Sequence, residues 1–187
     1  MRKITIKKEN AKRKKVILGI ILVFVMFASV FGIITNSFGK ETNSRRVIYN
    51  GFEFAEQNGF WIVNVGGEEF MFRTNPKETE EMQFELEKVL EDYRDKPFYV
   101  DSKNYEANLE IYNNLERFVQ RMQVACFEEP CEEGVPVKTC ENNFIIIKER
   151  DLPLIKSDNG CVFISGPEID LIGLTDKFLF KLLGIEQ

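Results

Sequence analysis

The residues that could do chemistry in this chain are four cysteines and an excess of carboxylates, because the sequence contains no histidine. Without histidine there can be no Ser-His-Asp triad, no Cys-His pair, and no histidine general base. The sequence also carries no Walker A, dinucleotide-binding glycine or EF-hand motif. Much of the enzyme repertoire is thereby removed, and no cofactor is expected.

The cysteines are best explained as structural disulfides. Their spacing is C-x4-C-x8-C-x20-C, which lacks the close C-x2-C pairs of a structural zinc site and the C-x-x-C of a redox dithiol. A zinc site made of all four cysteines is the alternative. An even number of cysteines outside the cytoplasm indicates disulfides, for which three pairings exist. We prefer Cys126–Cys131, which would close a small loop, with Cys140–Cys161, which would tie that loop to the last strands; each should contribute about 2–4 kcal/mol.

Three carboxylates are candidates for acid/base or cation chemistry. Asp101 follows the short apolar strand Phe98–Val100, where open sheets place their ligands. Asp170 and Asp176 could converge with it from the other end of the domain, as an acid/base pair or as ligands of a hard cation. The competing interpretation places Asp101 and Asp176 at helix N-termini, facing the helix dipole. We therefore treat the three as catalytic candidates only, and expect no resident metal.

The side of the membrane on which these residues lie depends on a long apolar run near the N-terminus. Residues 16–34 read VILGIILVFVMFASVFGII, without a charge, which is long enough to span a bilayer as a helix. Insertion of its Val, Ile, Leu and Phe side chains should gain about 4–8 kcal/mol. A buried core helix is the alternative, but such helices rarely stay apolar all round. We predict a transmembrane helix over 16–35, and the membrane as a partner.

Charge around this span predicts its orientation. Residues 1–15 hold eight basic residues and one acid, so the chain's net charge of −5 leaves −12 on residues 36–187. The positive-inside rule places residues 1–15 in the cytoplasm as a basic tail and exports the remainder. A cleaved signal peptide is less favoured, because the run is long and lacks a good cleavage site. An exported part this acidic is not expected to bind nucleic acid.

The first half of the part predicted to be exported is expected to form strands followed by a helix. Residues 36–46 form a tether and residues 47–187 form one domain. Alternating residues predict strands at Val47–Ala55, Phe60–Val65 and Glu69–Arg73, with turns at Asn58-Gly59 and Gly66-Gly67. Asn75 is expected to cap a helix, with Pro76 in its first position and Glu78 completing a capping box. Met82, Leu86, Val89 and Tyr93 would form its inward face, before Pro97 ends it.

A second helix and further strands are expected after Asp101. An apolar stripe runs from Tyr105 to Cys126; we interpret it as packing on a sheet, with a coiled-coil seam as the alternative. Phe144–Ile147 is predicted to be a central strand buried on both faces. Cys161–Ile164 and Ile169–Ile172 would be strands, and a final helix, Asp176–Leu183, would be capped by Thr175. The domain is therefore predicted to be α+β, with a mixed-sheet α/β arrangement as the variant.

Three stretches carry a resemblance to known proteins: GFEFAEQNGFWIVNVGGEEFMFRTNPKETE, PVKTCENNFIIIKE and CVFISGPEIDLIGLTDKFLFKLLGI. In these aromatic and glycine patterns the chain resembles uncharacterised single-pass, membrane-anchored exterior proteins of small-genome archaea. The resemblance agrees with a location outside the cell and supplies no catalytic residues. The absence of histidine and of nucleophile motifs, together with the regular helical stripe, favours a non-enzymatic binding or envelope-assembly module with a protein partner. The alternative is a carboxylate-based or cation-dependent hydrolase acting outside the cell.

Overall fold

The computed structural model describes residues 15–27, 45–80, 82 and 84–186. The chain divides into two units, Met1–Asn43 and Ser44–Gln187. In the first unit residues 15–27 form a helix with exposed side chains. Most of the predicted tail, the second part of the predicted span and nearly all of the tether lie outside the described residues. No helix in the described part of the chain is both long and apolar enough to cross a membrane.

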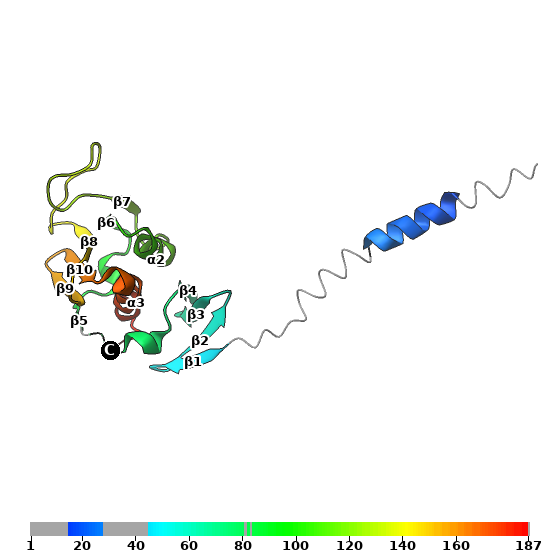
Figure 1. The fold of residues 1–187 in the computed structure, drawn as a ribbon, viewed down its shortest axis with the longest axis horizontal. Helices are drawn as coiled ribbons and strands as arrows, with labels where there is room; N and C mark the ends of the chain where they lie inside the picture. The colour runs from blue at the N-terminus through cyan, green and yellow to red at the C-terminus, as the bar shows by residue number, and fades with distance from the viewer. Residues whose placement is uncertain (1–14, 28–44, 81, 83, 187) are drawn as a thin grey trace, which may run out of the picture. The chain divides into compact units, whose positions relative to one another are not determined.

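The second unit begins with a four-stranded antiparallel sheet in the order β1-β2-β3-β4 (Figure 1). Its strands are β1 (Arg46–Tyr49), β2 (Phe52–Gln57), β3 (Phe60–Val65) and β4 (Glu68–Phe72). Both expected turns are present, but the expected first strand is two strands. Asn50 and Gly51 separate them, with φ angles of 48° and 87°. Asn-Gly in this left-handed conformation forms the tight turn that matches the twist of a hairpin.

The second sheet has six strands in the order β5-β9-β10-β8-β6-β7. The strands β6, β7, β8 and β10 run parallel to one another, whereas β9 is antiparallel to β10. Residues 144–147 of β8 are buried, which confirms the predicted central strand. The bounds are β5 (Phe84–Glu85), β6 (Pro97–Ser102), β7 (Arg121–Val124), β8 (Asn143–Glu149), β9 (Leu154–Asp158) and β10 (Cys161–Gly166).

Two helices, α2 (Tyr105–Leu115) and α3 (Leu171–Leu182), lie between the two sheets. On one side, Phe180 of α3 packs edge-on against Phe54 and Phe72 of the four-stranded sheet. On the other, α3 lies against β10 (Figure 1). Because α3 is covered from both sides, nearly all of its residues are buried, as its almost continuous apolar sequence predicts. The domain is thus α+β, in agreement with the expectation.

The helix predicted after Asn75 is wrong beyond its first turn. Asn75 does cap a 3₁₀ helix, η1 (Pro76–Thr79), by accepting a hydrogen bond from the Lys77 N–H. The chain then extends to form β5 beside β9 and a second 3₁₀ turn, η2 (Leu90–Asp92). Leu86 and Tyr93 are buried, but Val89 between them is exposed. The apolar residues of this segment have helical spacing by coincidence. The segment is extended because it crosses from the four-stranded sheet to the edge of the six-stranded sheet.

The second helix is present but shorter than predicted, and its buried face differs. Tyr105 and Tyr112, which belong to the expected stripe, are exposed, while Ala107, Ile111 and Leu115 are fully buried. The helix ends at Leu115, and after a turn at residues 116–120 the chain forms β7 (Arg121–Val124), whose backbone pairs with β6. The stripe therefore packs within the domain, as preferred, and does not continue as a coiled-coil seam.

The end of the chain also differs from the prediction. Residues 168–170 form the 3₁₀ turn η3 (Glu168–Asp170) instead of a strand, and α3 begins at Leu171. Thr175 is consequently inside the helix, where its hydroxyl donates to the Leu171 carbonyl at 2.7 Å, and it caps nothing. The chain leaves the sheet at Gly166, where an added Cβ would lie 2.6 Å from the Leu174 side chain. That close packing leaves no room for a side chain at position 166.

The cysteines form two disulfides, Cys126–Cys131 and Cys140–Cys161, the pairing that we preferred. The loop that contains three of them covers the face of the six-stranded sheet opposite the helices. Phe127 from this loop packs edge-on against Phe144 and Phe163. The loop thus acts as a stapled cover over a small second core.

Candidate functional site

A cavity of about 560 Å³ lies at the carboxyl ends of β6, β7 and β8. After β6 the chain moves through α2 to β7 on one side, whereas after β8 it continues to β9 and β10 on the other. Neighbouring strands whose connections leave in opposite directions open a crevice at their carboxyl ends, which is where sheets of this kind bind ligands. The volume is in the range of small-molecule sites.

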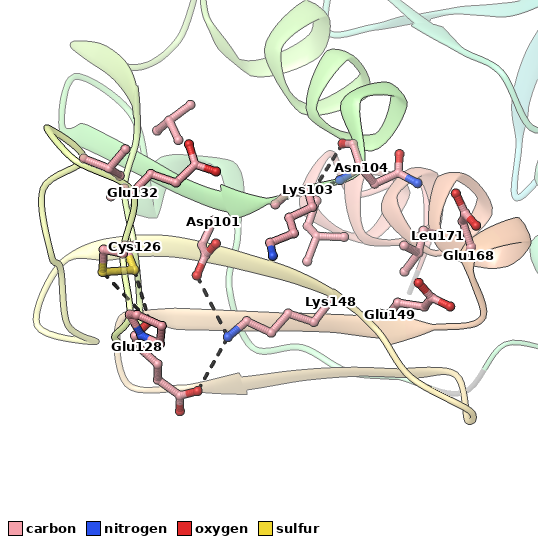
Figure 2. Close-up of a pocket in the computed structure, with 17 residues that line it drawn as sticks. Asp101, Lys103, Asn104, Cys126, Glu128, Glu132, Lys148, Glu149, Glu168 and Leu171 are labelled. Atoms are coloured by element: carbon pink, nitrogen blue, oxygen red, sulfur yellow. Dashed lines mark hydrogen bonds and ion pairs between the residues drawn. A yellow bond between two sulfur atoms is a disulfide. The ribbon is translucent and has the colours of Figure 1, made fainter.

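Three charged side chains converge in this cavity (Figure 2). Asp101, at the end of β6, accepts a hydrogen bond from the Phe127 N–H at 3.0 Å. Lys148, at the end of β8, places its ammonium group 4.0 Å from Asp101 and 3.6 Å from Glu128. The Asp101 carboxylate therefore ties the stapled loop to the sheet and orients Lys148. This arrangement gathers charges of both signs at one cavity, as a binding site requires.

The first disulfide forms part of the cavity wall. Cys126 and Cys131 line it together with Glu128 and Glu132, and Figure 2 shows the disulfide beside Glu128. Reactive cysteines need positive neighbours that stabilise the thiolate, and carboxylates do the opposite. We therefore interpret this disulfide as a structural staple that holds the wall in place.

The loop that makes this wall is also fixed by its backbone. The Cys126 N–H donates to the Pro136 carbonyl, and the Lys138 N–H donates back to the Cys126 carbonyl. The Ala125 N–H donates to the Val100 carbonyl at 3.0 Å, which joins the loop's start to β6. The cavity is therefore bounded on this side by chain that is both cross-linked and hydrogen-bonded.

The structure does not bring the three predicted carboxylates together. Asp101 lines the cavity, but Asp170 and Asp176 do not. Asp170 occupies the position before α3 and makes no side-chain capping bond. Asp176 lies inside α3 and is fully buried, so the expectation that it stands at a helix N-terminus is wrong. The same expectation for Asp101 is also wrong, because Asp101 lies in strand β6. Among the described residues no group of three or more acidic or cysteine side chains could hold a metal ion.

Asp176 belongs to a different cluster, closed to solvent between the helices and β4. Its Oδ2 accepts a hydrogen bond from the Thr74 N–H at 2.8 Å, while Oδ1 is buried without a hydrogen bond to any described residue. Burial and the neighbouring Glu110 raise the pKa of Asp176 well above its usual value. Burial also raises the pKa of Glu110, but Arg73, 3.0 Å away, opposes this. Because Arg73 pairs with Glu110 and not with Asp176, we predict that Asp176 is the member that holds a proton, and we interpret the pair as structural.

Sequence reasoning found Asp101 but missed most of the cavity. Lys148 and Glu149 directly follow the apolar strand Phe144–Ile147, so the rule that identified Asp101 would also have identified them. Glu128 and Glu168 carried no such signal, because they come from loops whose fold is set by the disulfide and by η3.

Comparison of the chain with protein-family models, with curated proteins and with solved structures found no match.

Proposed function

We propose that this chain is a membrane-anchored extracytoplasmic protein whose C-terminal domain is a non-enzymatic binding or envelope-assembly module. The address is supported by the basic residues before the apolar run 16–35, by the −12 charge after it and by the two disulfides. The binding role is carried by one observation: a pre-organised, charged cavity at the carboxyl ends of β6 and β8.

The alternative, a carboxylate-based or cation-dependent hydrolase, has less support. Its three proposed residues do not share a cavity, and Asp101 is already engaged by the Phe127 N–H and faces Lys148. A general acid/base pair requires two groups that reach one substrate. The binding module requires only a shaped, charged surface, which the cavity supplies.

Topology is tested with reporters fused to the C-terminus of the full chain. A reporter active only outside the cytoplasm should work, and one active only inside should not. The opposite result would refute the exterior address.

Binding is tested with a photoreactive amino acid in place of Lys103, which is exposed and lines the cavity. The matched control replaces Glu53, an exposed residue of β2 on the other sheet. In its native membrane, the full chain should give an adduct of defined mass from position 103 and none from position 53. Equal labelling at both positions, or none at 103, would contradict the binding role.

A further inference from the structure

Two of the most exposed apolar side chains of the domain lie on neighbouring connections beside the cavity. Leu152, between β8 and β9, is 77% exposed, and Ile169, in η3, is 87% exposed. Single exposed apolar residues are common and need no explanation. These two, however, belong to segments that are joined by a hydrogen bond from the Arg150 N–H to the Gly166 carbonyl at 2.8 Å.

The residues next to Leu152 and Ile169 in the chain, Asp151 and Glu168, line a hollow that shares walls with the cavity. A second hollow of about 400 Å³ is lined by Glu149, Arg150, Asp151, Pro167 and Glu168. Glu149 and Glu168 also line the main cavity, and Figure 2 shows them on its side nearest α3. We call the two hollows with Leu152 and Ile169 the carboxyl-edge surface.

This surface is predominantly acidic. Its two hollows are lined by six carboxylates and three basic side chains. One of the basic side chains, Lys148, already lies between Asp101 and Glu128. The charge that remains for a ligand is therefore negative, on a domain that is itself strongly acidic.

We propose that the carboxyl-edge surface docks a basic segment of a partner protein, one that carries bulky apolar side chains among its lysines or arginines. This rests on the proposed function and names its partner class. A small cation in the main cavity would leave Leu152 and Ile169 exposed, whereas a peptide segment can cover both hollows and the apolar pair. Anionic lipid headgroups would be repelled by the same carboxylates, so a membrane surface fits poorly.

The test uses the full chain in nanodiscs of zwitterionic lipid, with empty nanodiscs as the blank. The probe is a short soluble fluorescent peptide with arginines on both sides of a leucine pair. Two companion peptides replace the arginines by glutamates or the leucines by serines. Fluorescence anisotropy should show binding of the first peptide, weaker binding of the serine peptide and none of the glutamate peptide. Binding should weaken as salt rises, because exposed charges are screened.

Two double variants locate the binding to this surface. Leu152→Ser with Ile169→Ser removes the apolar pair, and Glu149→Gln with Glu168→Gln removes the carboxylates common to both hollows. Each should weaken binding by about tenfold or more. The controls are Ile48→Ser, a change at a comparably exposed apolar residue of β1, and Glu78→Gln, a change at an exposed residue of η1; neither should alter affinity.

Several outcomes would overturn the proposal: no binding of the basic peptide, equal binding of the glutamate peptide, or equal losses in the control variants. The photocrosslinking at position 103 separates this proposal from the one it rests on. A non-protein adduct there would leave the binding module standing and refute the basic protein partner. Absence of any adduct would refute the binding module itself.

Discussion

Replacing Asp176 by Asn should leave the fold intact and remove a pH dependence of its stability. The Asn carbonyl can accept the hydrogen bond that Asp176 Oδ2 now receives from the Thr74 N–H. The amide N–H of the new Asn can donate a hydrogen bond toward Glu110, in place of the carboxyl proton that a neutral Asp176 would donate. Because Asn resembles a protonated Asp in shape and hydrogen bonding, the substitution should change stability at acidic pH by only about 1 kcal/mol.

The magnitude of the pH effect follows from one proton. In the unfolded chain the pKa of Asp176 should be about 3.9, whereas burial and Glu110 raise its pKa in the folded domain. Between these two pKa values the folded state binds more protons than the unfolded state, so stability falls as pH rises. The slope reaches about 1.4 kcal/mol per pH unit. This stability is fully present below the unfolded pKa and is lost as pH rises through the folded pKa.

The assay is urea unfolding at a series of pH values, followed by the fluorescence of Trp61, the single tryptophan, which is buried in β3. The difference in unfolding free energy between Asp176→Asn and the natural chain should grow in favour of the variant as pH rises above about 4. The matched control, Asp151→Asn, makes the same chemical change at an exposed position. A difference that stays constant with pH would refute the idea that Asp176 carries a buried proton.

Two further predictions concern the C-terminal segment and the two disulfides of the domain. A chain truncated after Ile172 should not fold, because it loses seven buried large apolar side chains: Leu174, Phe178, Leu179, Phe180, Leu182, Leu183 and Ile185. Their burial is worth about 10–21 kcal/mol, which is at least comparable to a whole domain's stability; protease resistance equal to that of the full chain would contradict this. Serine replacement of Cys140 and Cys161 should cost about 3 kcal/mol and that of Cys126 and Cys131 about 2 kcal/mol, because their separations are 21 and 5 residues. Urea unfolding measures both, and the reverse order would show that loop closure does not govern the stabilisation.

The elements that were predicted well are those governed by local signals. The turns at Asn58-Gly59 and Gly66-Gly67 specify hairpins, because glycine reaches positive φ without strain, and the structure has them at φ values from 54° to 91°. The apolar run Phe144–Ile147 indicated a strand covered on both faces. The missed turn at Asn50-Gly51 carried the same signal, so the first hairpin was also within reach of sequence reasoning.

The elements that were predicted wrongly depend on distant partners. The segment after Thr79 has helical spacing, but pairing of β5 with β9 extends it. The stripe after Leu115 also has helical spacing, but pairing of β7 with β6 ends the helix. A strand forms when a neighbouring strand satisfies its backbone hydrogen bonds, and here that neighbour lies far away in the sequence or beyond a helix. Periodicity within one segment contains no information about it.

The sequence by itself determined the residue inventory: no histidine, an even number of cysteines, a charge-free apolar run behind basic residues, and a strongly acidic remainder. These follow from composition and from short-range spacing alone. Only the tertiary structure decided which carboxylates meet. It placed Asp101 beside Lys148 and Glu128 in an open cavity, and it buried Asp176 beside Glu110 in the interior of the domain. The reason is that each group is positioned by the packing of helices and loops on two sheets, and packing joins residues that the sequence keeps far apart.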